Sequence, residues 1–129
     1  MVLRWLFYAL AVIQLIFGLG FLVIPETVGS QYGGSMNVTA VAIARYWASS
    51  LLGLAWISWV AAAAMASPLK LVIVRASALA SLLGLVVTFI AYSAGVINTG
   101  GLVVNIVLTG VFLVGFAYYG WMRTSETVA

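Results

Sequence analysis

Long apolar runs alternate with short polar segments along the chain. Each run is long enough to cross the hydrocarbon core of a bilayer, which takes roughly 20 mostly apolar residues in a helix. The runs occupy about residues 2–24, 37–66, 68–93 and 102–121. The pattern predicts an all-α fold in which a single membrane domain, residues 1–129, forms a bundle of four transmembrane helices.

Proline, serine and glycine mark the ends of these helices. Pro25 ends the first run, because a proline cannot continue a helix without the loss of a backbone hydrogen bond. Residues 25–36 therefore predict an outer loop, with one interfacial turn after Pro25, and the Gly-rich residues 94–101 predict the second outer loop. Ser67 and Pro68 are typical of a helix start, so the inner loop near residue 67 is expected to be short.

Positive charges lie on one side of the predicted bundle. The loops at 25–36 and 94–101 contain no Lys or Arg. Cations instead precede the first run, open the third and follow the fourth in a polar tail at 122–129; they are Arg4, Lys70, Arg75 and Arg123. Because cytoplasmic loops carry an excess of Lys and Arg, both termini are predicted to be cytoplasmic. We expect a multi-pass protein of the cell membrane, specifically the cytoplasmic membrane of a bacterium or archaeon.

The first run has an alternative interpretation as a cleaved signal peptide. Arg4 precedes it, and Ala9-Leu10-Ala11 imitates a cleavage site. That site comes too early in the run, which continues to Ile24, so the sequence favours a transmembrane helix.

A weak internal similarity relates the two halves of the chain. The segment LLGLAWISW at 51–59 resembles LVGFAYYGW at 113–121. It suggests two similar helical hairpins joined in one chain. Leu, Gly and aromatic residues recur in any membrane helix, so a chance similarity carries equal weight.

Composition excludes most site chemistry. The chain has no Cys, His or Asp, and its only acidic side chains are those of Glu26 and Glu126. Zinc, iron, thiol redox and Ser-His-Asp catalysis each lack an obligatory residue type, so we expect no metal and no cofactor. An enzyme that uses Glu26, Arg45 and Tyr46 is disfavoured, because one loop carboxylate without a positioned partner is a poor general acid or base. The five Lys and Arg residues are scattered along the chain, so they do not form the basic patch that nucleic-acid binding requires.

Arg45 is the most informative polar residue inside a predicted helix. It lies ~12 Å into the second helix when counted from Asn37, where an Arg costs ~2.5 to 3.5 kcal/mol at mid-membrane. Such a residue normally faces a bundle interior, a cavity or a counter-charge. Glu26 is on the same side of the membrane, and we hypothesise a Glu26–Arg45 pair. The pair could anchor an anionic ligand or lipid headgroup; alternatively, Arg45 snorkels to the interface or pins the first helix to the second.

Helical spacing places the other polar and small residues on stripes that are expected to meet in the bundle. The predicted ligand-binding residues are Arg45, Glu26, Gln14, Asn105 and Thr88. The predicted helix-packing residues are Gly18, Ser49, Gly53, Ser77, Ser81, Gly84 and Thr109. If the polar side chains converge, they form the default binding site. The alternative is that Gln and Asn hydrogen-bond between helices as structural contacts, at about 0.6 to 2 kcal/mol each.

One family resemblance is carried by GLGFLVIPE at 18–26, a short Gly-rich loop, and ARYWASSLLGLAWISWVA at 44–61. This pattern resembles small bacterial four-helix membrane proteins grouped with the DoxX-like proteins. Its marks are the Pro-Glu after the first helix and the Arg45 to Gly53 spacing in the second. The resemblance implies a four-helix bundle. Some DoxX-like members are associated with quinone-linked sulfur oxidation or act as assembly helpers, but this chain lacks the thiol or imidazole that supports a redox role.

These observations favour a non-catalytic accessory, stabilising or assembly component of a membrane complex. Its partners would be the lipid bilayer together with other membrane subunits or a second copy of itself, and no nucleic acid. The alternative is a lipid, quinone or small-anion binder, or a transporter subunit, with an outward-facing polar site at Arg45 and Glu26.

Overall fold

Helices account for nearly all of residues 2–128, the part of the chain that the computed structural model describes, and no strand occurs there. The long helices are α1 (Val2–Val23), α3 (Val38–Ala63), α4 (Pro68–Ser93) and α5 (Thr99–Ala117), and the short ones are α2 (Pro25–Gln31), the π-helix η1 (Tyr118–Met122) and α6 (Ser125–Val128). Four segments are long and apolar enough to cross a membrane: α1, α3, α4, and α5 continued through η1. The predicted all-α fold with four transmembrane helices is confirmed, and the chain is a multi-pass membrane protein by this measure.

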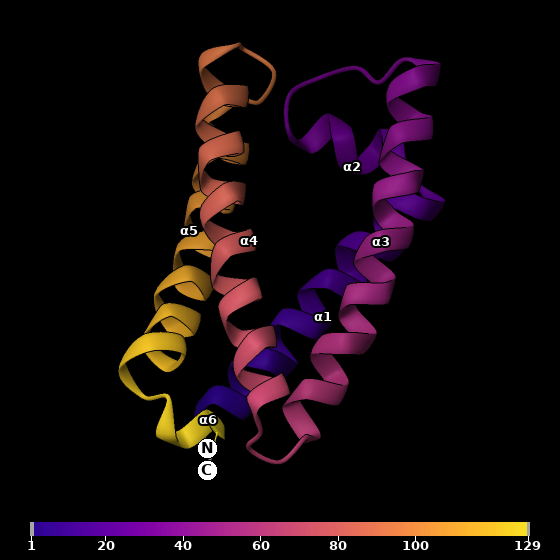
Figure 1. Ribbon diagram of the computed structural model, residues 1–129. Helices are drawn as coiled ribbons and strands as arrows, with labels where there is room; N and C mark the ends of the chain where they lie inside the picture. The colour runs from indigo at the N-terminus through magenta and orange to yellow at the C-terminus, as the bar shows by residue number, and fades with distance from the viewer. Residues whose placement is uncertain (1, 129) are drawn as a thin grey trace.

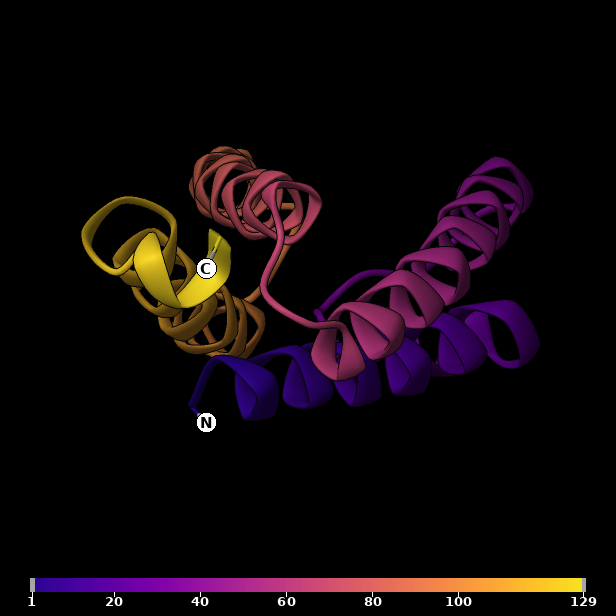
Figure 2. The same ribbon diagram turned by 60° about the horizontal axis from the view of Figure 1, so that its bottom comes forward.

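The long helices associate as two pairs in chain order. α1 packs along α3 to form the first pair, and α4 packs along α5 to form the second (Figure 1). The pairs meet at the end of the molecule where both chain ends lie, here called the terminal end, and they diverge toward the far end (Figure 1). Seen from the terminal end, the start of α1 lies beside α5 (Figure 2). The arrangement is that of two hairpins, as the internal similarity suggested, rather than of four equally packed helices.

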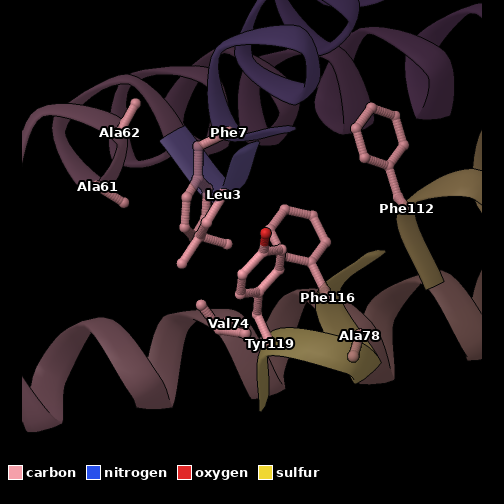
Figure 3. Packing of buried hydrophobic residues seen from close by; sticks show 9 residues of the cluster. All are labelled: Leu3, Phe7, Ala61, Ala62, Val74, Ala78, Phe112, Phe116 and Tyr119. Carbon is pink, nitrogen blue, oxygen red and sulfur yellow. The ribbon is translucent and has the colours of Figure 1, made fainter. Parts of the chain in front are cut away.

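A buried cluster at the terminal end joins the two pairs (Figure 3). Phe7 and Phe116 are completely buried at its centre, with ring centroids 4.9 Å apart. The cluster draws on all four long helices and η1, and consists of Leu3, Phe7, Ala61, Ala62, Val74, Ala78, Phe112, Phe116 and Tyr119. A smaller cluster of Phe21, Ala44 and Ala48 belongs to the first pair alone. The apolar packing that unites the pairs is therefore concentrated at one end.

Two helix ends differ from the sequence prediction. α5 begins at Thr99 rather than at residue 102, because the side chain of Asn98 accepts a 2.7 Å hydrogen bond from the Gly101 amide and so caps the helix before the glycines. α3 ends at Ala63 rather than at 66. The turn before α4 is correspondingly longer than expected, and Ser67 caps α4 as predicted.

The C-terminal residues fold back onto the terminal end instead of trailing as a polar tail. Thr127, in α6, is fully buried, and its carbonyl oxygen accepts a 2.6 Å hydrogen bond from the Ser67 amide. On the same side, the Nε of Arg75 donates a 3.0 Å hydrogen bond to the Gly120 carbonyl in η1. A π-helix displaces carbonyls from the regular α-helical pattern, so this contact is available to a side chain from α4.

α2 bridges the two pairs at the far end, within the predicted loop 25–36. The Asn98 amide donates a 2.8 Å hydrogen bond to the Tyr32 carbonyl, and Asn98 Nδ2 donates to the Gln31 carbonyl at 3.3 Å. Gly33 follows with φ +97°, a conformation that favours glycine. The end of α2 is thus held against the start of α5, even though α1 and α5 diverge here.

Candidate functional site

Arg45 and Glu26 are both exposed, and the structure forms no ion pair between them. Arg45 lies about 10 Å along α3 from the first residue of the helix. Ala44 and Ala48 are buried against the first helix, so Arg45 is turned about 100° away from that contact. Glu26 occupies the first turn of α2, where a carboxylate is favoured by the helix dipole without any cation. The hypothesised Glu26–Arg45 pair is therefore not part of this conformation.

The contact face of α3 is made of alanines rather than of the predicted stripe. The buried residues of this helix are Ala44, Ala48, Ala55, Ser58, Ala61 and Ala62. Ser49 and Gly53, predicted to pack between helices, lie on the exposed side, and a Cβ added at Gly53 would meet nothing within 4 Å. Alanine is small enough for close helix approach, so glycine and serine are not required here. The alanine spacing of four and seven residues is the signal that could have identified this face.

Gln14 makes a contact between two helices of the first pair. Its Oε1 accepts a 2.9 Å hydrogen bond from the hydroxyl of Ser58, which is buried. Gly18 lies one turn further along α1 and is also buried, and a Cβ added there would come within 2.8 Å of Leu52 and 3.3 Å of the Ala48 carbonyl. Gln14 and Gly18 therefore bring α1 against α3. Sequence reasoning missed Ser58, although it is a hydroxyl within an apolar run.

Thr88 and Asn105 belong to the second pair. Thr88 is buried, and its hydroxyl donates a 2.7 Å hydrogen bond to the Gly84 carbonyl. The Thr109 hydroxyl donates to the Asn105 carbonyl, and a Cβ added at Gly84 would lie 3.3 Å from Thr109. Gly84 and Thr109 thus lie at the contact between α4 and α5.

The remaining small polar residues of α4 satisfy their hydroxyls within the helix. Ser77 donates to the Ile73 carbonyl and Ser81 to the Ser77 carbonyl, at 2.9 Å each. Both side chains are half-buried. They need no polar partner on another helix, so they contribute to packing rather than to a polar centre.

The predicted polar spot is divided between the two pairs. Within residues 2–128, no hydrogen bond joins Gln14 or Arg45 to Thr88 or Asn105. The prediction assumed that all four helices pack evenly around one axis. Gln14 bonds within the first pair and Thr88 within the second, so no hydrogen bond of the described chain joins these side chains across the pairs.

Two cavities are lined by residues of both helix pairs. One, of about 290 Å³, lies at the terminal end between α3 and α4 and is lined by Trp56, Ile57, Val60, Ala61, Ala64, Ser67, Leu69, Lys70 and Ile73. The other, of about 430 Å³, lies at the far end between α1, α2 and α5 and is lined by Phe17, Thr27, Val28, Gln31, Tyr32, Gly100, Gly101 and Val104. Burial beside the second cavity raises the pKa of the Tyr32 phenol above its ordinary value. Neither cavity is lined by the predicted ligand-binding residues.

The side chains that line the two cavities suit the binding of apolar or amphipathic groups. Among residues 2–128, no three His, Cys, Asp or Glu side chains are grouped as a metal site would require. The two cavities instead offer apolar walls, hydroxyls, an amide and one ammonium group. Such surfaces can hold an amphipathic molecule or another helix.

No protein-family model, curated protein or solved structure matches the chain.

Proposed function

We propose that the protein is a non-catalytic accessory subunit that stabilises or helps to assemble a larger complex in the cytoplasmic membrane. The observation that carries this proposal is the exposed face of α3, defined by Arg45, Ser49 and Gly53 and here called the outer α3 face. No other helix of the described chain covers it. The resemblance to DoxX-like proteins, some of which act as assembly helpers, also favours an accessory role.

The outer α3 face is unfavourable against lipid and well shaped for another helix. An Arg within a spanning helix costs ~2.5 to 3.5 kcal/mol at mid-membrane unless it reaches water or a partner. The Ser49 hydroxyl already donates a 2.7 Å hydrogen bond to the Tyr46 carbonyl, so this serine needs no polar neighbour. Ser49 and Gly53 instead have small side chains that project little from the helix backbone. Transmembrane helices approach one another closely at such small residues. If Arg45 snorkels, its guanidinium reaches water and the cost of its charge in the membrane falls, but the small residues Ser49 and Gly53 still have no helix packed against them.

A partner helix that supplies a carboxylate or free carbonyls to Arg45 would satisfy both features. Its backbone would run close to Gly53, where an added Cβ meets nothing within 4 Å of this chain. The partner is then another membrane subunit or a second copy of this protein.

Co-purification in mild detergent tests the proposal, with Gly53→Leu compared against Gly110→Leu. Gly110 is the matched control, because a Cβ there also meets nothing within 4 Å. We expect the wild type and Gly110→Leu to retain a stoichiometric protein partner or a second copy, and Gly53→Leu to lose it while keeping its helical circular dichroism. A monomer without any partner, or equal retention by all three proteins, would overturn the proposal.

A second candidate function, binding of a lipid or quinone-like amphipath, is supported by the far-end cavity. Its volume of about 430 Å³ is in the range of small-molecule sites, at roughly 300 to 1,000 Å³. Phe17, Val28 and Val104 supply apolar walls, and Gln31 and Tyr32 supply polar groups. This site differs from the one expected at Arg45 and Glu26.

Mass spectrometry of organic extracts from the purified protein tests this candidate. Val104→Phe should fill part of the cavity and reduce a co-purifying amphipath, whereas Val103→Phe, at a neighbouring exposed position that does not line the cavity, should not. An extract that contains only bulk lipid in the same amount for all three proteins would remove this candidate.

A further inference from the structure

Lys70 is a nearly buried cation at the edge of the terminal-end cavity. Its relative exposure is 8%, and it lies in the first turn of α4. Its Nζ donates a 2.7 Å hydrogen bond to the Ala64 carbonyl at the end of α3. An ammonium group has three donors, and this carbonyl is the one acceptor that the described residues offer. A buried charge with unused donors is costly without an anionic partner.

A second cation adds to the positive charge at this place. Arg4, in the first turn of α1, is close enough to Lys70 for the two charges to repel each other. Lys70 forms no ion pair with any side chain that the structure describes. The positive field at the mouth of the cavity is therefore suited to an anion.

The cavity itself is apolar. Trp56 and Val60 of α3 face Ile73 of α4 across a space of about 290 Å³. It lies where the first pair is connected to the second, and at the end of the spanning helices, where headgroups would meet hydrocarbon. Apolar walls beside a buried ammonium match an amphipathic molecule that carries hydrocarbon chains and an anionic headgroup. Basic pockets between transmembrane helices bind anionic lipid headgroups in this way.

We propose that the terminal-end cavity is a binding site for an anionic phospholipid. The phosphate lies against Lys70, and part of one acyl chain lies along Trp56, Val60 and Ile73. Because the site is formed by α3 of the first pair and α4 of the second, the bound lipid stabilises the junction of the pairs. This inference is independent of the outer α3 face and of any partner subunit.

Native mass spectrometry of the full-length protein in detergent tests the proposal, with dioleoyl phosphatidylglycerol and dioleoyl phosphatidylcholine as probes. We expect the wild type to retain one phosphatidylglycerol in preference to phosphatidylcholine and to unfold at a higher temperature with it. Lys70→Gln should weaken phosphatidylglycerol retention about fivefold, the usual effect of one cation on an anionic lipid, and Lys70→Arg should restore it. Arg123→Gln, which removes a cation at the same end but outside the cavity, should have little effect.

Two further measurements test the cavity walls and the acyl chain separately from the charge of Lys70. Val60→Phe keeps Lys70 and narrows the cavity, so it should reduce retention of the lipid even if Lys70→Gln does not fold. Inorganic phosphate alone should not raise the unfolding temperature, because the acyl chain is part of the fit. Equal retention of the two lipids by the wild type, or the same thermal protection by phosphate, would overturn the proposal.

Discussion

The Ser58 hydroxyl donates a 2.9 Å hydrogen bond to Gln14 Oε1 and so links α3 to α1 away from the loops that connect them. Ser58 is buried and Gln14 half-buried. Within a membrane no water replaces a lost partner, so a polar contact between spanning helices both holds and orients them.

Removal of either partner should destabilise the first pair. We expect Gln14→Leu and Ser58→Ala each to lower the free energy of unfolding by about 0.6 to 1.7 kcal/mol, the average and the maximum measured for hydrogen bonds between transmembrane helices. The double variant should cost less than the sum of the two, because both changes remove one bond. Unfolding in mixed detergent micelles measures this, with Ser50→Ala as control, since the Ser50 hydroxyl bonds only to the Tyr46 carbonyl of its own helix. Simple additivity would mean that the two side chains do not interact.

Gly18 should tolerate no large side chain. A Cβ at this position already lies 2.8 Å from Leu52 Cδ2 and 3.3 Å from the Ala48 carbonyl, so Gly18→Leu must separate α1 from α3. We expect a loss of about 1 to 3 kcal/mol, as for other overpacked contacts. Gly53→Leu in the isolated chain is the control and should change stability by less than about 0.5 kcal/mol. If both variants unfold alike, the buried contact at Gly18 is not what holds the pair together.

Loss of the Asn98 side chain should lower the free energy of unfolding more than loss of the Asn37 side chain, which also caps a helix. Asn98→Ala removes the cap on α5 and also the hydrogen bond to the Gln31 carbonyl, whereas Asn37→Ala removes only the cap on α3 at Ala40. A lost cap costs ~1 kcal/mol, so the excess cost of Asn98→Ala reports the bridge between the pairs.

Spin labels at Val38 and Val96, both exposed at the far end, give a direct readout of this bridge. The native chain has no Cys, so each label goes only to its engineered cysteine. In Asn98→Ala the backbone hydrogen bond from the Asn98 amide to the Tyr32 carbonyl remains, so the two helix pairs should stay linked at the far end. The link is weaker without the side chain, so the distance distribution between the labels should broaden. Identical distributions in the two asparagine variants would show that the side-chain bridge contributes nothing.

Orientation follows from charge placement and can be measured in intact cells. Both chain ends lie at the terminal end, where Lys and Arg gather, so this end is predicted to be cytoplasmic. A membrane-impermeant maleimide should label Ser35→Cys at the far end and should reach Ser125→Cys only after permeabilisation. Labelling in the reverse order would place the positive end outside and contradict the predicted topology.

The spanning helices were predictable, because backbone groups in lipid must be satisfied within a helix and the required length is set by the bilayer. The Ser67 cap was also predictable, since its side chain acts on the amide of Lys70 three residues away. The start of α5 was misplaced because the Gly-rich segment was interpreted as a loop. Its cap, Asn98, decides that the glycines belong to the first turn.

The faces of the helices were harder to predict. Lipid and protein interior are almost equally apolar, so a spanning helix lacks the polar and apolar contrast that marks the buried side of a soluble helix. On α3, both the alanines and the Ser49–Gly53 stripe satisfy the small-residue criterion, and only the position of α1 decides between them. The sequence indicates that Gln14 is a polar residue inside a spanning helix, but its hydrogen-bond partner, Ser58, depends on the packing of α1 against α3.

The divergence of the pairs had no signal in local sequence. Phe7, Phe112 and Phe116 pack the pairs together at the terminal end, whereas at the far end the pairs are linked through α2 and its hydrogen bonds to Asn98. The predicted polar spot depended on the opposite assumption, an even bundle.

The central claim, that another helix covers the outer α3 face, is tested most directly by photocrosslinking in the native membrane. Benzoylphenylalanine in place of Tyr46, an exposed aromatic next to Arg45, keeps an aromatic side chain there and leaves Arg45, Ser49 and Gly53 unchanged. The same replacement at Tyr92, exposed on α4, is the control. We predict that irradiation yields a discrete protein adduct from position 46 and none from position 92. Adducts with lipid alone from position 46 would contradict the claim.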